Sequence, residues 1–287
     1  MLADARVQKL IMELKNWPGP ILSSHRSAQQ FYHKLAFLAD IGVQSDDEGV
    51  QEIIDRIMQY HDNQGIPQLP MSIPESYGGS GKETYAWALC DAPTILYALG
   101  KMGYTGDSMP NAVNFLAKKC RANGWGCEVS SELGSWHGPG KKSDACPYAN
   151  LLMLKLLLLY SQKFKPEILS AAQELLRLWE NSRTEHPYIF YMGNDFRKLK
   201  LPFIWYDIIH VVEVLSQIRE IHADRRFQEM IKIIYNKETP SGDFISESVY
   251  KTWNEWDFGQ KKQPSEWLGF IITRIRARLS DNHDINK

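Results

Sequence analysis

The chain has 287 residues, of which 44% are hydrophobic and 23% are charged, and its formal net charge is −1. A charge so near zero produces no field that favours nucleic acid or an anionic lipid surface. The longest apolar run, residues 151–160, is interrupted by Lys155 and is shorter than the ~20 residues of a membrane-spanning helix. No signal peptide is recognisable, and four cysteines are spread over the chain. We therefore expect a cytoplasmic protein with reduced thiols, no membrane span and no nucleic-acid partner.

The predicted elements are nearly all helices, and they alternate between two kinds. One kind is apolar on almost every side, whereas the other carries a single apolar stripe, such as Val50, Ile53, Ile54 and Ile57. In chain order we expect an unpaired helix at 3–14, then pairs at 27–41 and 48–62, at 88–102 and 108–120, at 146–161 and 166–181, and at 203–219 and 224–236, followed by a last helix at 265–279. The Gly- and Pro-rich segments 63–87 and 121–143 are expected to be loops.

The apolar helices recur along the chain, which predicts the architecture. They end at Asp40, Leu99, Tyr160 and Leu215, with spacings of about 59, 61 and 55 residues. A helix that is apolar on all sides must be buried on all sides, and an amphipathic helix must cover it. We therefore predict one all-α domain over residues 1–287, an α/α toroid of about five helix hairpins. Its long loops would gather at one mouth of a central cavity.

Three apolar helices are predicted to begin beside an acidic residue: Asp91, Asp144 and Asp207. An Asp at this position ordinarily caps free N–H groups and complements the helix dipole. Three at one mouth of a cavity would also converge on one small volume. Asp91 and Asp207 are therefore candidate catalytic residues. Any two of Asp91, Asp144 and Asp207 could serve as acid and base in a carbohydrate-active toroid, a further alternative.

Asp144, Cys146 and His210 form the most specific constellation. Carboxylate, thiolate and imidazole are ordinary zinc ligands, and a catalytic zinc keeps three protein ligands and one open position. The spacing predicts Zn²⁺ at these residues, with Cys127 as an optional fourth ligand and Cys90 as a further thiol nearby. The alternative interpretation is that Cys146 is a small buried hydrophobic residue and His210 a core histidine.

These residues resemble the β-subunits of the protein prenyltransferases, α/α toroids related to terpenoid and squalene cyclases. The resemblance rests on Asn123-Gly124-Trp125, Gly140-Lys141-Lys142, Asp144-Ala145-Cys146 and His210. It implies zinc at Asp144, Cys146 and His210, and contact of Lys141 with an isoprenoid diphosphate. The His that the family has at an earlier helix start is replaced by Leu89-Cys90-Asp91, and neither D-x-D-D nor D-D-x-x-D occurs. A distant bacterial-type relative fits these departures better than a true protein prenyltransferase.

Basic and aromatic residues complete the predicted binding site. Lys141, Arg197 and Lys200 would hold an anionic head group, while Tyr148 and Trp205 would line an apolar cavity. The leading hypothesis is thus a transferase-like toroid that binds an apolar, isoprenoid-like ligand. The alternative is a non-catalytic scaffold that binds a peptide or a partner protein, with the partner subunit unspecified. Metal content would separate these hypotheses most simply.

Overall fold

Ten α-helices are the main regular elements in the part of the chain that this computed structural model describes, residues 2–138, 140–187 and 189–280. They are α1 (Ala5–Leu14), α2 (Phe31–Asp40), α3 (Val50–Ile57), α4 (Ala92–Lys101), α5 (Met109–Ala117), α6 (Pro147–Leu157), α7 (Lys165–Glu180), α8 (Ile208–Leu215), α9 (Arg225–Tyr235) and α10 (Glu266–Ser280). The predominance of helices over strands confirms the predicted helical class. The chain divides into two compact units, Met1–Ala171 (unit 1) and Ala172–Lys287 (unit 2), and the division falls within α7.

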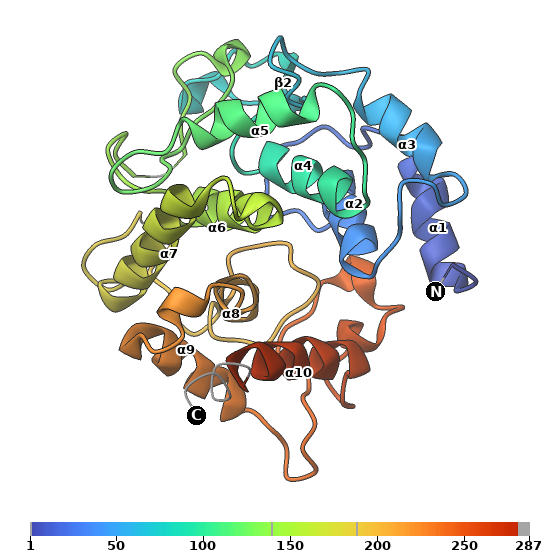
Figure 1. The fold of residues 1–287 in the computed structure, drawn as a ribbon. Coiled ribbons are helices and arrows are strands. Elements are labelled where there is room, and N and C mark those ends of the chain that lie inside the picture. The colour runs from blue at the N-terminus through green and yellow to red at the C-terminus, as the bar shows by residue number, and fades with distance from the viewer. Residues whose placement is uncertain (1, 139, 188, 281–287) are drawn as a thin grey trace. The chain divides into compact units, whose positions relative to one another are not determined.

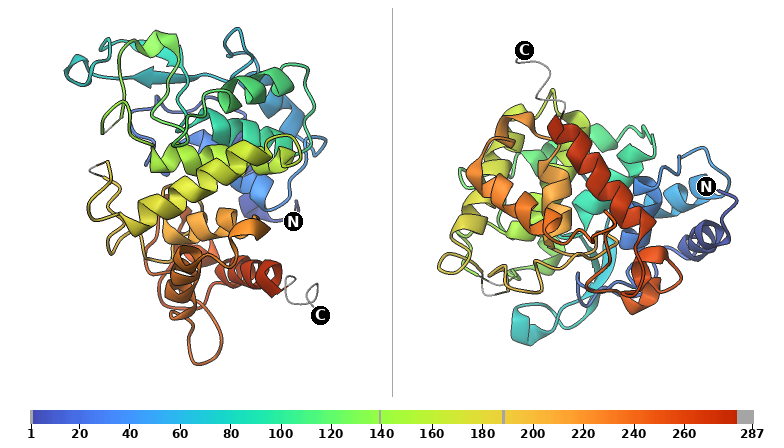
Figure 2. Two further views of the ribbon diagram at one scale, coloured as in Figure 1. Left: turned by 60° about the vertical axis from the view of Figure 1, so that its left-hand side comes forward. Right: turned by 90° about the horizontal axis from the view of Figure 1, so that it is seen from below.

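In unit 1 the apolar helices α2, α4 and α6 form the centre. α4 packs against both α2 and α6, and Figures 1 and 2 show the three helices side by side. Every residue of α6 is buried, including Lys155. α1, α3 and α5 bury only one face each, for example Val7, Leu10, Ile11 and Leu14 of α1. Within this unit, buried helices therefore alternate with amphipathic helices that cover them, as the periodicity predicts.

A small sheet lies in the segment that we expected to be a loop. Strands β1 (Leu69–Ser72) and β2 (Glu83–Ala86) pair antiparallel, with Leu69 opposite Ala86 and Ser72 opposite Glu83. Leu69 and Met71 are buried, so the hairpin contributes to the core of unit 1. The expectation of a loop over residues 63–87 was wrong because its Pro and Gly content concealed two short strands.

Unit 2 is built around α8, whose eight residues are all buried. α8 packs against α9 and α10. α9 buries one face, made by Phe227, Met230, Ile231 and Ile234. Asp224 precedes α9, and its carboxylate accepts the Arg226 backbone N–H at 2.9 Å, which satisfies one of the free donors at the helix start.

Several helices begin later than their apolar runs. α2 begins at Phe31 rather than at residue 27, and α8 begins at Ile208 rather than at residue 203. Before α8, the cis peptide at Leu201-Pro202 and the segment that follows it are irregular, although their side chains are largely buried. The residues before α8 are apolar because they are buried, although their backbone is not helical, and the apolar run is therefore longer than the helix. Among the residues placed by the structure, no helix is both long and apolar enough to cross a membrane.

Candidate functional site

The loop before α6 is fixed to that helix by Asn150, which is fully buried. The Asn150 Oδ1 accepts the Trp125 backbone N–H at 3.0 Å, and its Nδ2 donates to the Trp125 and Cys146 carbonyls at 2.7 and 2.8 Å. Gly124 is required beside it, because its φ is +78° and a Cβ would lie 2.1 Å from Asn150 Oδ1. These bonds hold Cys146 at the N-cap of α6.

Cys146 lies against a second thiol at this helix start. Its sulfur accepts the Ala149 backbone N–H at 3.5 Å and a hydrogen bond from the Cys90 thiol. These bonds lower the pKa of Cys146, because they stabilise its thiolate. The same thiol–thiol bond, together with burial, raises the pKa of Cys90 well above its usual value. The pair is therefore polarised, with the negative charge favoured on Cys146.

A third thiol, Cys127, lies close enough to be affected by the charge of Cys146. Burial, reinforced by the charge of Cys146, raises the pKa of Cys127 to about 12. Its sulfur accepts the Gly138 backbone N–H at 2.9 Å. Cys127 is therefore a protonated neighbour of the Cys90–Cys146 pair at neutral pH.

Asp91, the N-cap residue of α4, is paired with a histidine that the sequence did not indicate. Its carboxylate is fully buried and lies 2.8 Å from His25 Nε2. Both of its oxygens also accept the Ala88 backbone N–H, each at 3.2 Å. Burial raises the pKa of Asp91, while the bonds to His25 and to backbone N–H groups oppose that increase. The candidate residue Asp91 thus has a specific side-chain partner, His25.

His25 is itself held by two buried aromatic side chains of α2. Its backbone carbonyl accepts bonds from the Tyr32 hydroxyl at 3.2 Å and from His33 Nε2 at 3.1 Å. Tyr32 and His33 are 0% and 2% exposed. Burial lowers the pKa of His33 to about 3, and the charges of His25 and Lys155 act in the same direction. His33 is therefore neutral in the folded protein.

This neutral histidine predicts a loss of stability in acid. Between the folded pKa of about 3 and the ordinary value of 6.5, the unfolded chain binds a proton that folded His33 does not. The contribution of neutral His33 to the unfolding free energy is therefore complete above pH 6.5 and is lost as the pH falls. We expect His33 to cost about 2 kcal/mol of unfolding free energy between pH 7.5 and pH 5.

The measurement is urea unfolding at both pH values for the wild type, His33→Gln and His137→Gln. The glutamine at position 33 can keep a donor to the His25 carbonyl but has no titratable group. The fall in unfolding free energy between pH 7.5 and pH 5 should therefore be about 2 kcal/mol smaller in His33→Gln than in the wild type. His137 is exposed and should leave the pH dependence unchanged. An identical pH dependence in His33→Gln and the wild type would contradict the assignment.

The remaining predicted residues of unit 1 occupy different settings. Asp144 does not begin α6; its carboxylate accepts the Lys141 backbone N–H at 2.8 Å and thus closes a local turn. Lys141 is exposed, whereas Tyr148 is buried in the first turn of α6, two residues after Cys146. Tyr148 therefore belongs to the buried surroundings of the thiols, while Lys141 lies at the surface.

The other predicted residues lie in unit 2, so the proposed zinc ligands are divided between the units. His210 Nδ1 donates to the Trp205 carbonyl at 3.0 Å. Asp207 is the N-cap residue of α8 and is buried. The Lys200 ammonium lies 4.1 Å from the centre of the Tyr250 ring, and the Arg197 guanidinium lies 5.2 Å from that of Trp179. Within the described ranges, no group of three or more His, Cys, Asp or Glu side chains is arranged to hold a metal ion.

The sequence singled out Asp91 and Cys146 as candidates but gave no indication of His25 or Tyr32. His25 lies in the irregular segment before α2, 66 residues from Asp91 along the chain, so no helical spacing connects them. Together these residues place an acid–imidazole pair and a polarised thiol pair at the starts of α4 and α6. Such a set can supply a thiolate nucleophile with a second thiol beside it. Comparison of the chain with protein-family models, with curated proteins and with solved structures yields no match.

Proposed function

We propose that Cys90 and Cys146 form a redox-active dithiol that exchanges with a disulfide substrate. The observation that carries this proposal is that the two thiols are close enough for each to shift the pKa of the other, since thiol–disulfide exchange needs a second sulfur within reach of the first. All four cysteines are free, and both members of the pair are partly exposed. Part of each residue therefore reaches the surface, while burial acts on both thiol groups.

The surroundings of the pair assign a different role to each thiol. Cys146 is the attacking group, because its sulfur accepts backbone N–H donors at the start of α6, where the helix dipole favours negative charge. Cys90 is the resolving group, because its interaction with Cys146 and its burial raise its pKa and keep it protonated at rest. Asp91 in turn is held by His25 at 2.8 Å.

The reaction balances without a metal or a cofactor. The Cys146 thiolate attacks one sulfur of the substrate disulfide, and the other substrate sulfur leaves as a thiolate, which takes up a proton. Cys90 then loses its proton and attacks the Cys146 sulfur, so that the second substrate sulfur leaves in turn. The substrate gains two electrons, and the protein holds a Cys90–Cys146 disulfide. A small thiol or dithiol reductant returns the protein to its starting state.

The test combines alkylation rates with a redox titration. At pH 7, iodoacetamide should modify Cys146 at least about tenfold faster than Cys120, because each unit by which a thiol pKa is lower raises its thiolate fraction up to tenfold. Titration with oxidised and reduced glutathione should form a Cys90–Cys146 disulfide, detected by mass spectrometry of unreduced peptides.

Cys120 provides the matched control, since it is also partly exposed in unit 1 and burial raises its pKa. Cys120→Ser should keep the disulfide, whereas Cys90→Ser and Cys146→Ser should each abolish it. Circular dichroism would establish that all variants remain folded. If Cys146 reacts no faster than Cys120 and no Cys90–Cys146 disulfide forms in oxidising buffer, the proposal is wrong.

Zinc binding is the second candidate function, and the third thiol favours it. Cys127 lies near Cys146 and accepts an N–H bond, as a metal-bound sulfur commonly does. The donors in the described part of the chain do not fit a metal ion as they are placed, so binding would require side chains to move. Elemental analysis of protein purified without chelator tests this candidate. Cys127→Ser should lower zinc content while leaving dithiol exchange intact, and Asp144→Asn tests the ligand set predicted from the sequence.

We also propose that the chain forms an α/α toroid and binds an apolar, isoprenoid-like ligand. The alternation of buried and amphipathic helices within unit 1 supports the toroid. The resemblance of Asp144-Ala145-Cys146 and His210 to the protein prenyltransferases motivates the isoprenoid-like ligand. Binding of farnesyl diphosphate, measured calorimetrically against geranyl acetate and inorganic diphosphate, would test the ligand.

A further inference from the structure

Unit 2 contains a cavity of about 330 Å³, and its lining includes Arg197 and Trp179. It is formed by the end of α7, the turn that follows, the segment before α8 and the first turn of α9. Three arginines and two glutamates contribute its charge: Arg183, Arg197, Arg225, Glu180 and Glu229. The lining therefore carries a formal charge of +1. This excess positive charge depends on which arginines lack a carboxylate partner.

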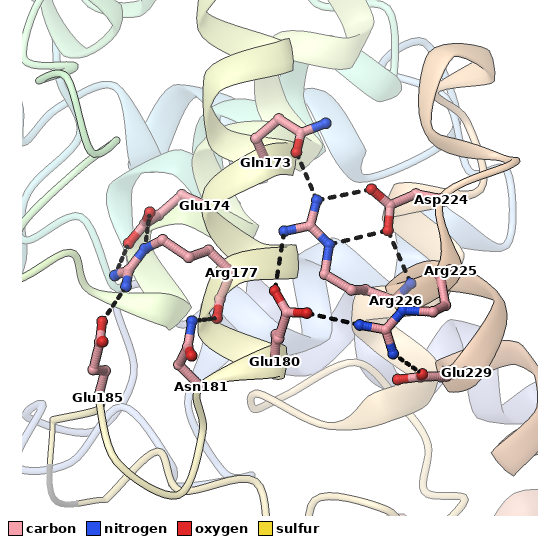
Figure 3. Close-up of polar contacts among 10 residues, drawn as sticks. All are labelled: Gln173, Glu174, Arg177, Glu180, Asn181, Glu185, Asp224, Arg225, Arg226 and Glu229. Carbon is pink, nitrogen blue, oxygen red and sulfur yellow. Dashed lines mark hydrogen bonds and ion pairs between the residues drawn. The ribbon is translucent and has the colours of Figure 1, made fainter.

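The two glutamates are already engaged by arginine, as Figure 3 shows. Arg225 donates to Glu229 and, at 2.7 Å, to Glu180. Arg226 pairs with Asp224 at 2.7 Å and also approaches Glu180 at 3.8 Å. The carboxylates at this edge of the cavity are thus neutralised by their neighbours, which weakens their repulsion of an incoming anion.

Arg183 and Arg197 differ from these arginines. Across the described residues, neither of the two has a carboxylate partner within ion-pair distance. The Arg197 guanidinium lies over the Trp179 ring at 5.2 Å, and its Nε is buried without a hydrogen-bond acceptor. A buried donor without an acceptor is destabilising, and an anionic ligand would supply the missing acceptor.

We propose that this cavity binds a small organic phosphate, with its phosphate group between Arg183 and Arg197. Guanidinium groups bind phosphate oxygens through paired N–H donors. Two guanidinium groups match the double negative charge of a phosphate monoester better than the single charge of a carboxylate ligand. The stacking of Arg197 on Trp179 restricts its guanidinium, which lowers the entropy lost on binding. The cavity volume lies in the range of small-molecule sites and exceeds what a phosphate ion alone would fill.

The test is isothermal titration calorimetry of the full chain with phenyl phosphate, inorganic phosphate and benzoate. Phenyl phosphate should bind saturably and more tightly than either of the others. Arg183→Gln should weaken its binding by about tenfold or more, the effect expected for loss of a charge-assisted hydrogen bond. Arg183 is exposed, so this variant should fold normally. Arg197→Lys keeps the charge but loses the planar donor fork, and should weaken binding by a similar factor.

Arg219→Gln is the matched control, because Arg219 is an exposed arginine of unit 2 outside the cavity lining. It should bind phenyl phosphate as the wild type does. Equal losses in Arg183→Gln and Arg219→Gln would overturn the site, since the attraction would then be a general charge effect. Inorganic phosphate as tight as phenyl phosphate would overturn the organic part of the proposal. Absence of saturable binding to all three probes would overturn it entirely.

Discussion

Lys155→Met is expected to lower the free energy of unfolding by about 3–5 kcal/mol, the usual cost of leaving one partner of a buried ion pair alone. Lys155 Nζ lies 3.0 Å from Asp40 Oδ2, and the two side chains are only 7% and 12% exposed. The Tyr97 hydroxyl donates to the other Asp40 oxygen at 2.6 Å. Removing the ammonium leaves the carboxylate with little solvent and with this neutral donor, which cannot balance its charge.

Urea unfolding of matched variants measures the effect. The control is Lys15→Met, which removes the surface ion pair between Lys15 and Glu52, two side chains that are 30% and 45% exposed. This variant should lower the free energy of unfolding by less than about 1 kcal/mol. Adding Asp40→Asn to Lys155→Met should recover much of the loss, because the charge disappears while the Tyr97 hydroxyl keeps an acceptor. If Lys155→Met costs no more than Lys15→Met, the pair contributes no buried charge interaction.

Asn150→Ala should destabilise the chain by about 3 kcal/mol, because buried backbone groups that lose their partners each carry a desolvation cost of about 1–3 kcal/mol. Asn150 serves the N–H and the carbonyl of Trp125 as well as the carbonyl of Cys146. The Cys146 backbone N–H also donates to the Trp125 carbonyl at 2.8 Å, so that oxygen keeps one bond. The expected cost is accordingly below the sum of three complete losses.

Asn111→Ala is the control for this variant, since its exposed amide donates to the Gln64 carbonyl at 3.0 Å and should cost less than about 0.5 kcal/mol. A second readout connects Asn150 to the dithiol. Because Asn150 holds the loop that positions Cys146, its loss should also slow alkylation of Cys146, with Cys120 unaffected. An Asn150→Ala protein as stable as Asn111→Ala would show that this loop is not fixed by the amide.

The helices of this chain could be predicted because burial and periodicity act over neighbouring residues. α6 and α8 are buried throughout, and both lie within continuous apolar runs of the sequence. The same rule failed at Pro202–Asp207, where side chains are largely buried but the backbone is irregular. It also failed at β1 and β2, because two four-residue strands within a Pro- and Gly-rich segment leave almost no periodic signal.

The site divides along the same line. Asp91 and Cys146 could be chosen as candidates because each stands at the start of an apolar helix, a position that the sequence itself marks. Their partners were not identifiable in this way, since His25 comes from an irregular segment and Cys90 was recognised only as a further thiol. The sequence by itself determined which segments are helical and which faces are buried, because those follow from local periodicity. Only the tertiary structure decided that His25 meets Asp91 and that Cys90 meets Cys146, because such contacts depend on how distant segments pack and no spacing along the chain encodes them.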